Sequence, residues 1–202
     1  MTDTSHKAAS QTLREIASWQ PGRGSADSDL LPELSTMVAR SRDLSRNHGI
    51  ASGAMQTLTD NIVGTGFRLS AKPDYKLLGK TKDWEEEWQT TVEGLWRSWS
   101  ETFMCDAAQS LNFHGLTTQV FKSCLINGEA LALALWLPKR PVATTIQLIE
   151  PDRLSNPNNS TDSKNLRGGV EIDRFGAPVA YYILKEHPGD YWMSSLEWER
   201  VP

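Results

Sequence analysis

The stretch EALALALWLPKR, residues 129–140, is where the sequence changes from a helical pattern to a strand pattern. Leucines occupy every second position from Leu131 to Leu137, and alanines or a tryptophan fill the positions between them. Alanine and leucine favour helices intrinsically, but a period of two places alternate side chains on opposite faces of a strand. We therefore expect a strand with a bulky leucine face and a closely packed alanine face, ended by Pro138.

The residues that follow this strand continue the β pattern. Three further segments read as strands: TTIQLIE (144–150), GGVEI (168–172) and APVAYYIL (177–184). DRFG (173–176), between the last two, is typical of a hairpin turn, so a mostly antiparallel arrangement is expected. The loop SNPNNSTDSKN (155–165) consists almost wholly of turn-forming residues, and it lacks the ligand spacing of a calcium-binding EF-hand.

The residues before the strand read as helices. One helix is expected from Leu30 to about Arg46, and a second carries apolar residues at a strict spacing of four, which predicts one buried stripe: Ile50, Ala54, Leu58 and Ile62. Gly64 is a helix stop, and residues 67–70 alternate like a short strand. Helices first and strands later indicate an α+β chain, helical over 30–127 and β-rich over 128–202.

The clearest helix runs from about Asp83 to Phe103 and carries a wide aromatic stripe. Its apolar residues repeat at intervals of three and four: Trp84, Trp88, Val92, Leu95, Trp99 and Phe103. Such a stripe could stack nucleic-acid bases or a ligand, but at helical spacing it indicates packing in a core or an interface. A further helix is expected from about Asn112 to Ile126, and Gly128 follows its end.

Residues 1–29 are polar, rich in Ser, Asp and Gly, and interrupted by Pro21 and Gly22. We interpret them as a flexible N-terminal arm that orders only against a partner, with Trp19 as its large apolar anchor and a candidate subunit contact. Neither this segment nor any later one has an apolar run of signal-peptide or membrane-span length, so a chain made in a cytoplasm and not inserted in a membrane is expected.

The charge balance argues against a free-standing nucleic-acid clamp, because 21 Lys and Arg face 25 Asp and Glu for a net charge of -4. Arginines nevertheless cluster at Arg40, Arg42 and Arg46 in ARSRDLSRN (39–47). Asp43 lies three residues from both Arg40 and Arg46, so a helix could pair these charges internally. Three interpretations stay open: the arginines coat a helix, contact a neighbouring subunit, or bind DNA as part of a nucleic-acid-binding module.

The sequence offers little support for an enzyme. Gly64-Thr65-Gly66 lacks the Gly-Lys-Ser/Thr of a phosphate-binding loop and leaves a helix rather than entering one. Cys105 and Cys124 stand without a CxxC pair, so two buried, reduced thiols are expected rather than zinc ligands or a disulfide. A cysteine hydrolase is the remaining enzymatic alternative, but neither thiol lies in a nucleophile motif. No catalytic residue, metal or cofactor is therefore predicted.

Several motifs occur in a characteristic order over about residues 19–202. They are RSRDLSRN, then GAMQTLTDNIVGTGFRLS, the Trp-rich helix, NGEALALALW, and PDRLSNPNNSTDSKNLRGGVEID followed by GAPVAYYI. With these motifs the chain resembles the lambda-type family of bacteriophage portal proteins. The pair SNPNN and RGGV is an unusual combination and is the most specific part of the resemblance.

The resemblance implies a structural role with no cofactor and no catalytic residues. It implies a ring of about a dozen copies at one capsid vertex of the virion, assembled in the bacterial cytoplasm. Its implied partners are terminase, capsid proteins, head-tail joining proteins and double-stranded DNA, which passes through the channel without sequence recognition. Residues 30–202 would form the wing-like α+β domain, and the chain would stop before the stem, clip and crown that family members carry further on.

Overall fold

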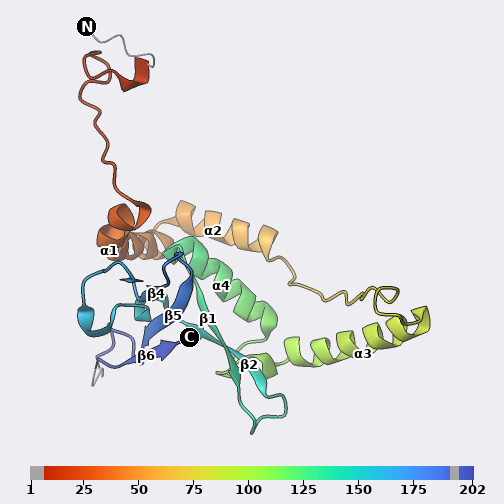
Figure 1. Ribbon diagram of the computed structural model, residues 1–202. Helices are drawn as coiled ribbons and strands as arrows, with labels where there is room; N and C mark the ends of the chain where they lie inside the picture. The colour runs from red at the N-terminus through yellow and green to blue at the C-terminus, as the bar shows by residue number, and fades with distance from the viewer. Residues whose placement is uncertain (1–6, 192–195) are drawn as a thin grey trace. The chain divides into compact units, whose positions relative to one another are not determined.

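The computed structural model describes residues 7–191 and 196–202 of the chain. Within them, four α-helices precede strands that form two separate antiparallel sheets (Figure 1), so the expected α+β class is confirmed. The chain divides into two compact units, residues 1–35 and 36–202. The first six residues of the predicted arm lie outside the described residues.

The first unit contains a short 3₁₀ helix, η1 (Lys7–Ala9), and the start of helix α1 (Ala26–Asn47). α1 begins earlier than the predicted start at Leu30. The reason is a cap, because the hydroxyl of Ser25 accepts a hydrogen bond of 3.2 Å from the backbone N–H of Ser28.

In the second unit, helix α2 (Gly49–Ile62) packs on helix α4 (Phe113–Asn127) through the side that carries the buried Thr59. The prediction that the four-residue stripe of α2 is buried is wrong. Its large members are exposed by 80%, 43% and 55%: Ile50, Leu58 and Ile62. The periodicity identified which residues share a face, but the covered side is the neighbouring row one position along, which includes Met55 and Thr59.

The segment between α2 and the next helix is not a strand, so the prediction of a strand over residues 67–70 is also wrong. Gly64 does end α2, with a φ of +54° that suits glycine. Beyond it, the backbone N–H of Ala71 donates a 3.0 Å hydrogen bond to the carboxylate of Glu93. The side chain of Glu93 therefore holds this segment. No described strand pairs with residues 67–70, and an alternating sequence forms a strand only when such a partner is present.

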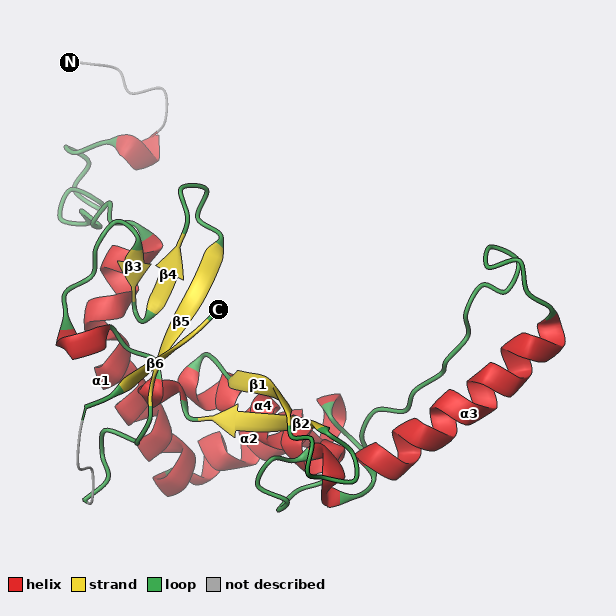
Figure 2. Cartoon of the chain, turned by 60° about the horizontal axis from the view of Figure 1, so that its bottom comes forward, coloured by secondary structure: helices red, strands yellow, loops and turns green. Residues whose placement is uncertain are grey.

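Helix α3 (Lys82–Ser100) begins at Thr81, whose hydroxyl caps the first turn, and carries the aromatic stripe. None of its residues is fully buried. Its C-terminal end lies beside strand β2 (Thr144–Ile149) in Figure 2, where the indole N–H of Trp99 donates a 2.9 Å hydrogen bond to the carbonyl of Thr144. Trp96, Trp99 and Phe113 form one aromatic cluster there, with ring centroids 5.1–5.7 Å apart.

The two cysteines have different environments. Cys105 ends the short helix η2 (Phe103–Cys105) and is completely buried, as predicted. Cys124 is exposed, so the prediction of a second buried thiol is wrong. It lies in the last turns of α4, which stops as expected at Gly128 with a left-handed φ of +82°.

The first sheet is a hairpin of strand β1 (Leu131–Trp136) and β2, paired from Leu131 with Ile149 to Trp136 with Thr144. The strand prediction for this leucine-alanine stretch is confirmed. Its leucines are half-buried, but the alanine face is exposed rather than closely packed, and Trp136 on that face is 72% exposed. The sheet therefore covers the chain's interior with one side only.

The second sheet has four antiparallel strands in the order of the sequence: β3 (Leu166–Arg167), β4 (Val170–Ile172), β5 (Pro178–Leu184) and β6 (Trp198–Val201). The predicted turn between β4 and β5 is confirmed, since the N–H of Asp173 bonds the carbonyl of Ala177 and Gly176 has a φ of +86°. Two short helices, η3 (Pro151–Arg153) and η4 (Pro157–Asn159), connect the sheets.

The buried apolar residues of the described chain are few, and β5 supplies the largest group of them: Ala180, Ile183 and Leu184. Many large apolar side chains on α1, α2 and α3 are instead exposed. No helix in residues 7–191 or 196–202 combines the length and apolarity needed to cross a bilayer.

Candidate functional site: exposed helix faces and the Arg42 network

The four residues predicted to contact a subunit or DNA have distinct environments. Trp19 is 69% exposed in the first unit. Arg40 and Arg46 are exposed on α1, and among the described residues neither side chain makes a hydrogen bond or an ion pair. Asp43 does not pair with them, because its carboxylate accepts a 2.6 Å hydrogen bond from the amide of Asn47.

Arg42 points inward and joins three parts of the second unit. Its guanidinium donates to both carboxylate oxygens of Asp152, at 2.5 and 3.0 Å, and its Nε donates to the amide oxygen of Asn127 at 2.8 Å. Asp152 lies in η3 and Asn127 ends α4, so one side chain connects α1 to both. This two-pronged geometry is specific to arginine.

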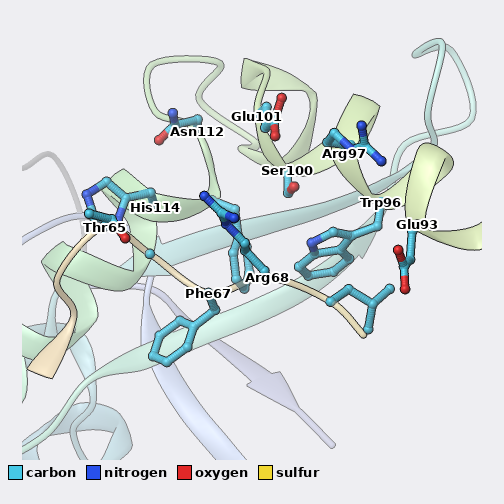
Figure 3. A pocket seen from close by; sticks show the side chains of 13 residues that line it. Thr65, Phe67, Arg68, Glu93, Trp96, Arg97, Ser100, Glu101, Asn112 and His114 are labelled. Carbon is cyan, nitrogen blue, oxygen red and sulfur yellow. The ribbon is translucent and has the colours of Figure 1, made fainter. Parts of the chain in front are cut away.

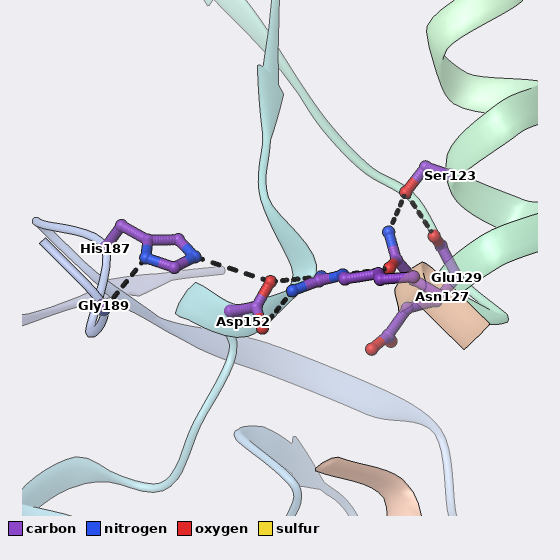
Figure 4. A network of polar contacts seen from close by, with 7 residues as sticks. Ser123, Asn127, Glu129, Asp152, His187 and Gly189 are labelled. Carbon is purple, nitrogen blue, oxygen red and sulfur yellow. Dashed lines mark hydrogen bonds and ion pairs between the residues drawn. The ribbon is translucent and has the colours of Figure 1, made fainter. Parts of the chain in front are cut away.

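Further hydrogen bonds extend the network on both sides of Asp152 (Figure 4). Asn127 donates to the hydroxyl of Ser123, which in turn donates to the backbone carbonyl of Glu129 at 2.8 Å. On the other side, Nε2 of His187 lies 3.6 Å from an Asp152 oxygen, and its Nδ1 accepts a bond from the N–H of Gly189. We refer to this set as the Arg42 network.

The charges of the Arg42 network shift the acidity of its carboxylates. Burial by itself would raise the pKa of Asp152, but the hydrogen bonds and positive charge of Arg42 outweigh burial and hold that pKa below its ordinary value. The same hydrogen bond raises the pKa of Arg42. Burial, with a smaller contribution from the Asp152 charge, raises the pKa of Glu129. Arg42 and Asp152 are thus stabilised as a charged pair.

A buried carboxylate organises the loop between η2 and α4. Asp106, 3% exposed, accepts hydrogen bonds from the backbone N–H groups of Ala108, Ser110 and Leu111 and from the Ser110 hydroxyl. Burial would raise its pKa, but these bonds lower it below the ordinary value. The guanidinium of Arg140 donates to two carbonyls of the same loop. Both anchors are structural.

A cavity of about 550 Å³ lies between the segment 65–69, the C-terminal half of α3 and the start of α4 (Figure 3). Trp96 and Phe113 line it beside charged residues of both signs, Arg68, Glu93 and Arg97. No cluster of three or more His, Cys, Asp or Glu side chains suited to a metal occurs within the described ranges 7–191 and 196–202.

Two helix faces expose large apolar groups next to charge. The α3 face consists of Trp88 and Leu95, 37% and 67% exposed, with Glu85 and Glu87 on its two flanks. The α1 face consists of Met37 and Leu44, 51% and 52% exposed, with Arg40 between them. In each pair the apolar residues are seven apart, which places them on one side of a helix. Exposed apolar patches of this kind mark interaction surfaces.

Sequence reasoning selected Arg42 but missed Asp152 and Asn127, its partners. They are 110 and 85 residues away in the chain, and no local motif connects them. The single available signal for Asp152 was its position, because Asp152 and Arg153 closely follow the predicted strand 144–150.

Comparison with known proteins gives a consistent result. The family described as phage portal protein, lambda family, matches residues 12–202. The chain is 35% identical to portal protein B of Escherichia phage lambda and 35% identical to the portal protein of Escherichia phage N15, each over 93% of this chain and 36% of the relative. It is 26% identical to the probable portal protein of a Halomonas phage, phiHAP-1, over 100% of this chain and 39% of the relative. The chain thus spans little more than a third of these relatives.

Proposed function

Because the chain belongs to the lambda family of phage portal proteins, we propose that it is a structural part of a portal ring at one capsid vertex. Terminase would package double-stranded DNA through this ring, and the DNA would later leave through it into the tail. The ring would contain about a dozen copies and would join capsid and head-tail proteins, with assembly in the bacterial cytoplasm. No catalytic step is part of the proposal.

The match to the family over residues 12–202 carries this proposal. Two features of the chain support it. A closed ring requires head-to-tail contacts, and hence two different surfaces on each copy, for which the α1 face and the α3 face are candidates. The net charge of -4 also suits a channel wall that DNA must slide past, because each retained cation-phosphate contact would strengthen binding.

Residues 30–202 are proposed to form a wing-like domain, with residues 1–29 as an arm that orders against a partner. In this proposal Trp19 is the anchor of the arm, and Arg40 and Arg46 are available for contacts between copies. Arg42 has a different task, since its hydrogen bonds are directed to Asp152 and Asn127 inside the chain.

The test is to express the complete reading frame that contains this sequence and to examine the purified product by electron microscopy and native mass spectrometry. Closed rings with a central channel are expected. A product that stays monomeric at every accessible concentration would refute the proposal.

A nucleic-acid-binding module is the second candidate, and the exposed, unpaired Arg40 and Arg46 are the observation in its favour. It predicts binding to duplex DNA whose affinity falls linearly with salt on logarithmic axes. Absence of binding at low salt would eliminate this alternative. The excess of acidic residues makes it the weaker of the two.

A further inference from the structure

We propose that the α3 face of one copy binds the α1 face of the next copy, with Arg40 as the central residue of the contact. This inference rests on the proposed ring and deepens it by assigning the two surfaces that meet.

The α3 face, made of one tryptophan and one leucine, is a surface that the described residues leave partly uncovered. The aromatic stripe of α3 is packed at its C-terminal end, where Trp99 lies against Phe113, but Leu95 is 67% exposed and Trp88 is 37% exposed. Large aromatic side chains contribute most of their free energy when a partner removes them from water. The exposed part of the stripe therefore requires a neighbour.

The charge of α3 defines the chemistry of that neighbour. The helix carries five carboxylates against two cations. Of the five, Glu93 is engaged by Ala71 and Gln89, and Glu86 pairs with Lys82 on the far side of the helix. The carboxylate of Glu87 has no hydrogen bond or ion pair in the described part of the chain, although its backbone carbonyl accepts a bond from Thr91. A complementary surface must therefore be apolar and carry a cation.

The α1 face meets both requirements. Arg40 lies three residues from Met37 and four from Leu44, so its guanidinium emerges between two apolar side chains. Arg40 has no partner among the described residues, whereas its neighbour Arg42 is fully engaged. An unpaired guanidinium between apolar groups can stack on an indole and bond a carboxylate together. Trp88 beside Glu87 provides those two acceptors.

The exposed stripe of α2 is a poorer match for the α3 face. α2 carries Asp60 as its single charged residue and no cation, so the carboxylates of α3 would have no counter-charge there. An α1–α3 contact that is not reciprocated between the same two copies is head-to-tail, because it leaves one surface of each kind free on the pair. Such a contact propagates around a ring instead of closing as a two-fold dimer.

Charge reversal in the complete protein tests the contact. Arg40→Glu and Glu87→Arg should each weaken assembly at least tenfold, measured as the concentration at which half of the chains are in rings. The double variant exchanges the two charges, so its half-assembly concentration should return to within about threefold of the wild-type value. The matched controls are Glu86→Arg on the opposite side of α3 and Arg174→Glu in the β4–β5 turn, and both should assemble like wild type.

The outcomes separate this inference from the proposed function. If wild type forms no rings, the proposed function fails and the inference with it. If wild type forms rings and neither charge reversal weakens them, the ring stands and the α1–α3 contact is refuted. If Arg40→Glu weakens DNA binding but leaves assembly unchanged, Arg40 is a DNA contact and the inference is equally refuted.

Cysteine cross-linking provides a second readout that does not depend on charge. In a Cys124→Ser background, which removes the exposed native thiol, chains carrying Met37→Cys or Leu95→Cys alone should not cross-link. A mixture of the two should give heterodimers, and a chain with both substitutions should give a ladder of multimers. Cross-linking of either single variant with itself, or a doubly substituted chain that stops at dimers, would indicate a two-fold contact and overturn the proposal.

Discussion

Arg42→Ala should destabilise the second unit by about 2–3 kcal/mol, because it removes three hydrogen bonds to polar partners that stay in place. Without the guanidinium, Asp152 would keep its charge while 26% exposed, and the nearest remaining side chain of the network would be His187 at 3.6 Å. The amide of Asn127 would lose the donor to its oxygen as well. Arg42 is the single side chain that connects α1 to both η3 and the end of α4 by hydrogen bonds within the described residues.

The expected magnitude follows from the exposure of the pair. A fully exposed ion pair contributes about 0–1 kcal/mol, and removal of one partner from a fully buried pair costs about 3–5 kcal/mol. The side chains of Arg42 and Asp152 are 29% and 26% exposed, so an intermediate value is expected. Arg42→Lys keeps the charge but loses the two-pronged geometry, and should cost about 1 kcal/mol.

The assay is urea unfolding followed by far-UV circular dichroism, with a double-mutant cycle of Arg42→Ala and Asp152→Ala. A coupling free energy of about 1–2 kcal/mol is expected. The matched control is the Arg200–Glu171 pair, which has a similar geometry but is 45% and 32% exposed, and its coupling should be smaller than that of the Arg42 pair. A coupling below about 0.5 kcal/mol for the Arg42 pair would refute the reasoning, because the pair would then behave as an ordinary surface contact.

Three further predictions concern other parts of the second unit. Gly169→Ala should cost about 3 kcal/mol or abolish folding, because Gly169 has a φ of +83° and a Cβ there would lie 2.6 Å from a backbone nitrogen; urea unfolding measures this. A thiol reagent should modify Cys124 in the folded protein but Cys105 only after unfolding, since Cys105 is completely buried, and equal rates would contradict the fold. Acid should destabilise the chain, because folding lowers the pKa values of Asp106 and Asp152. The stability that these two carboxylates contribute is fully present above their unfolded pKa near 3.8, and it is lost as the pH falls through the folded pKa values. A thermal midpoint that rises between pH 5 and pH 3 would contradict that sign.

The described residues bury few large apolar side chains and expose many. The large apolar side chains of α1, α2 and α3 exceed what residues 36–202 cover by themselves. Trp88 and Leu95 are examples. The helical spacing of the aromatic stripe predicts that they pack in a core or an interface, but both are exposed in the single chain. In a ring, neighbouring copies would remove such surfaces from water.

The sequence by itself determined where most of the helices and longer strands lie. The leucine-alanine alternation identified β1 against the helical propensity of its residues, because a period of two is a property of the strand backbone. Gly64 and Gly128 marked helix ends, since each requires a φ that other residues adopt with strain. The strand β6 was missed, because WERV is short and half charged and acquires its strand form by pairing with β5.

Only the tertiary structure decided which faces are covered and which polar groups meet. The stripe of α2 has the periodicity of a buried face, yet Ile50 is 80% exposed, because periodicity groups residues without identifying their neighbours. Arg42 and Arg40 look alike in the sequence, but the helix turns one inward to Asp152 and the other out to solvent. That difference depends on contacts across 110 residues, which no local pattern encodes.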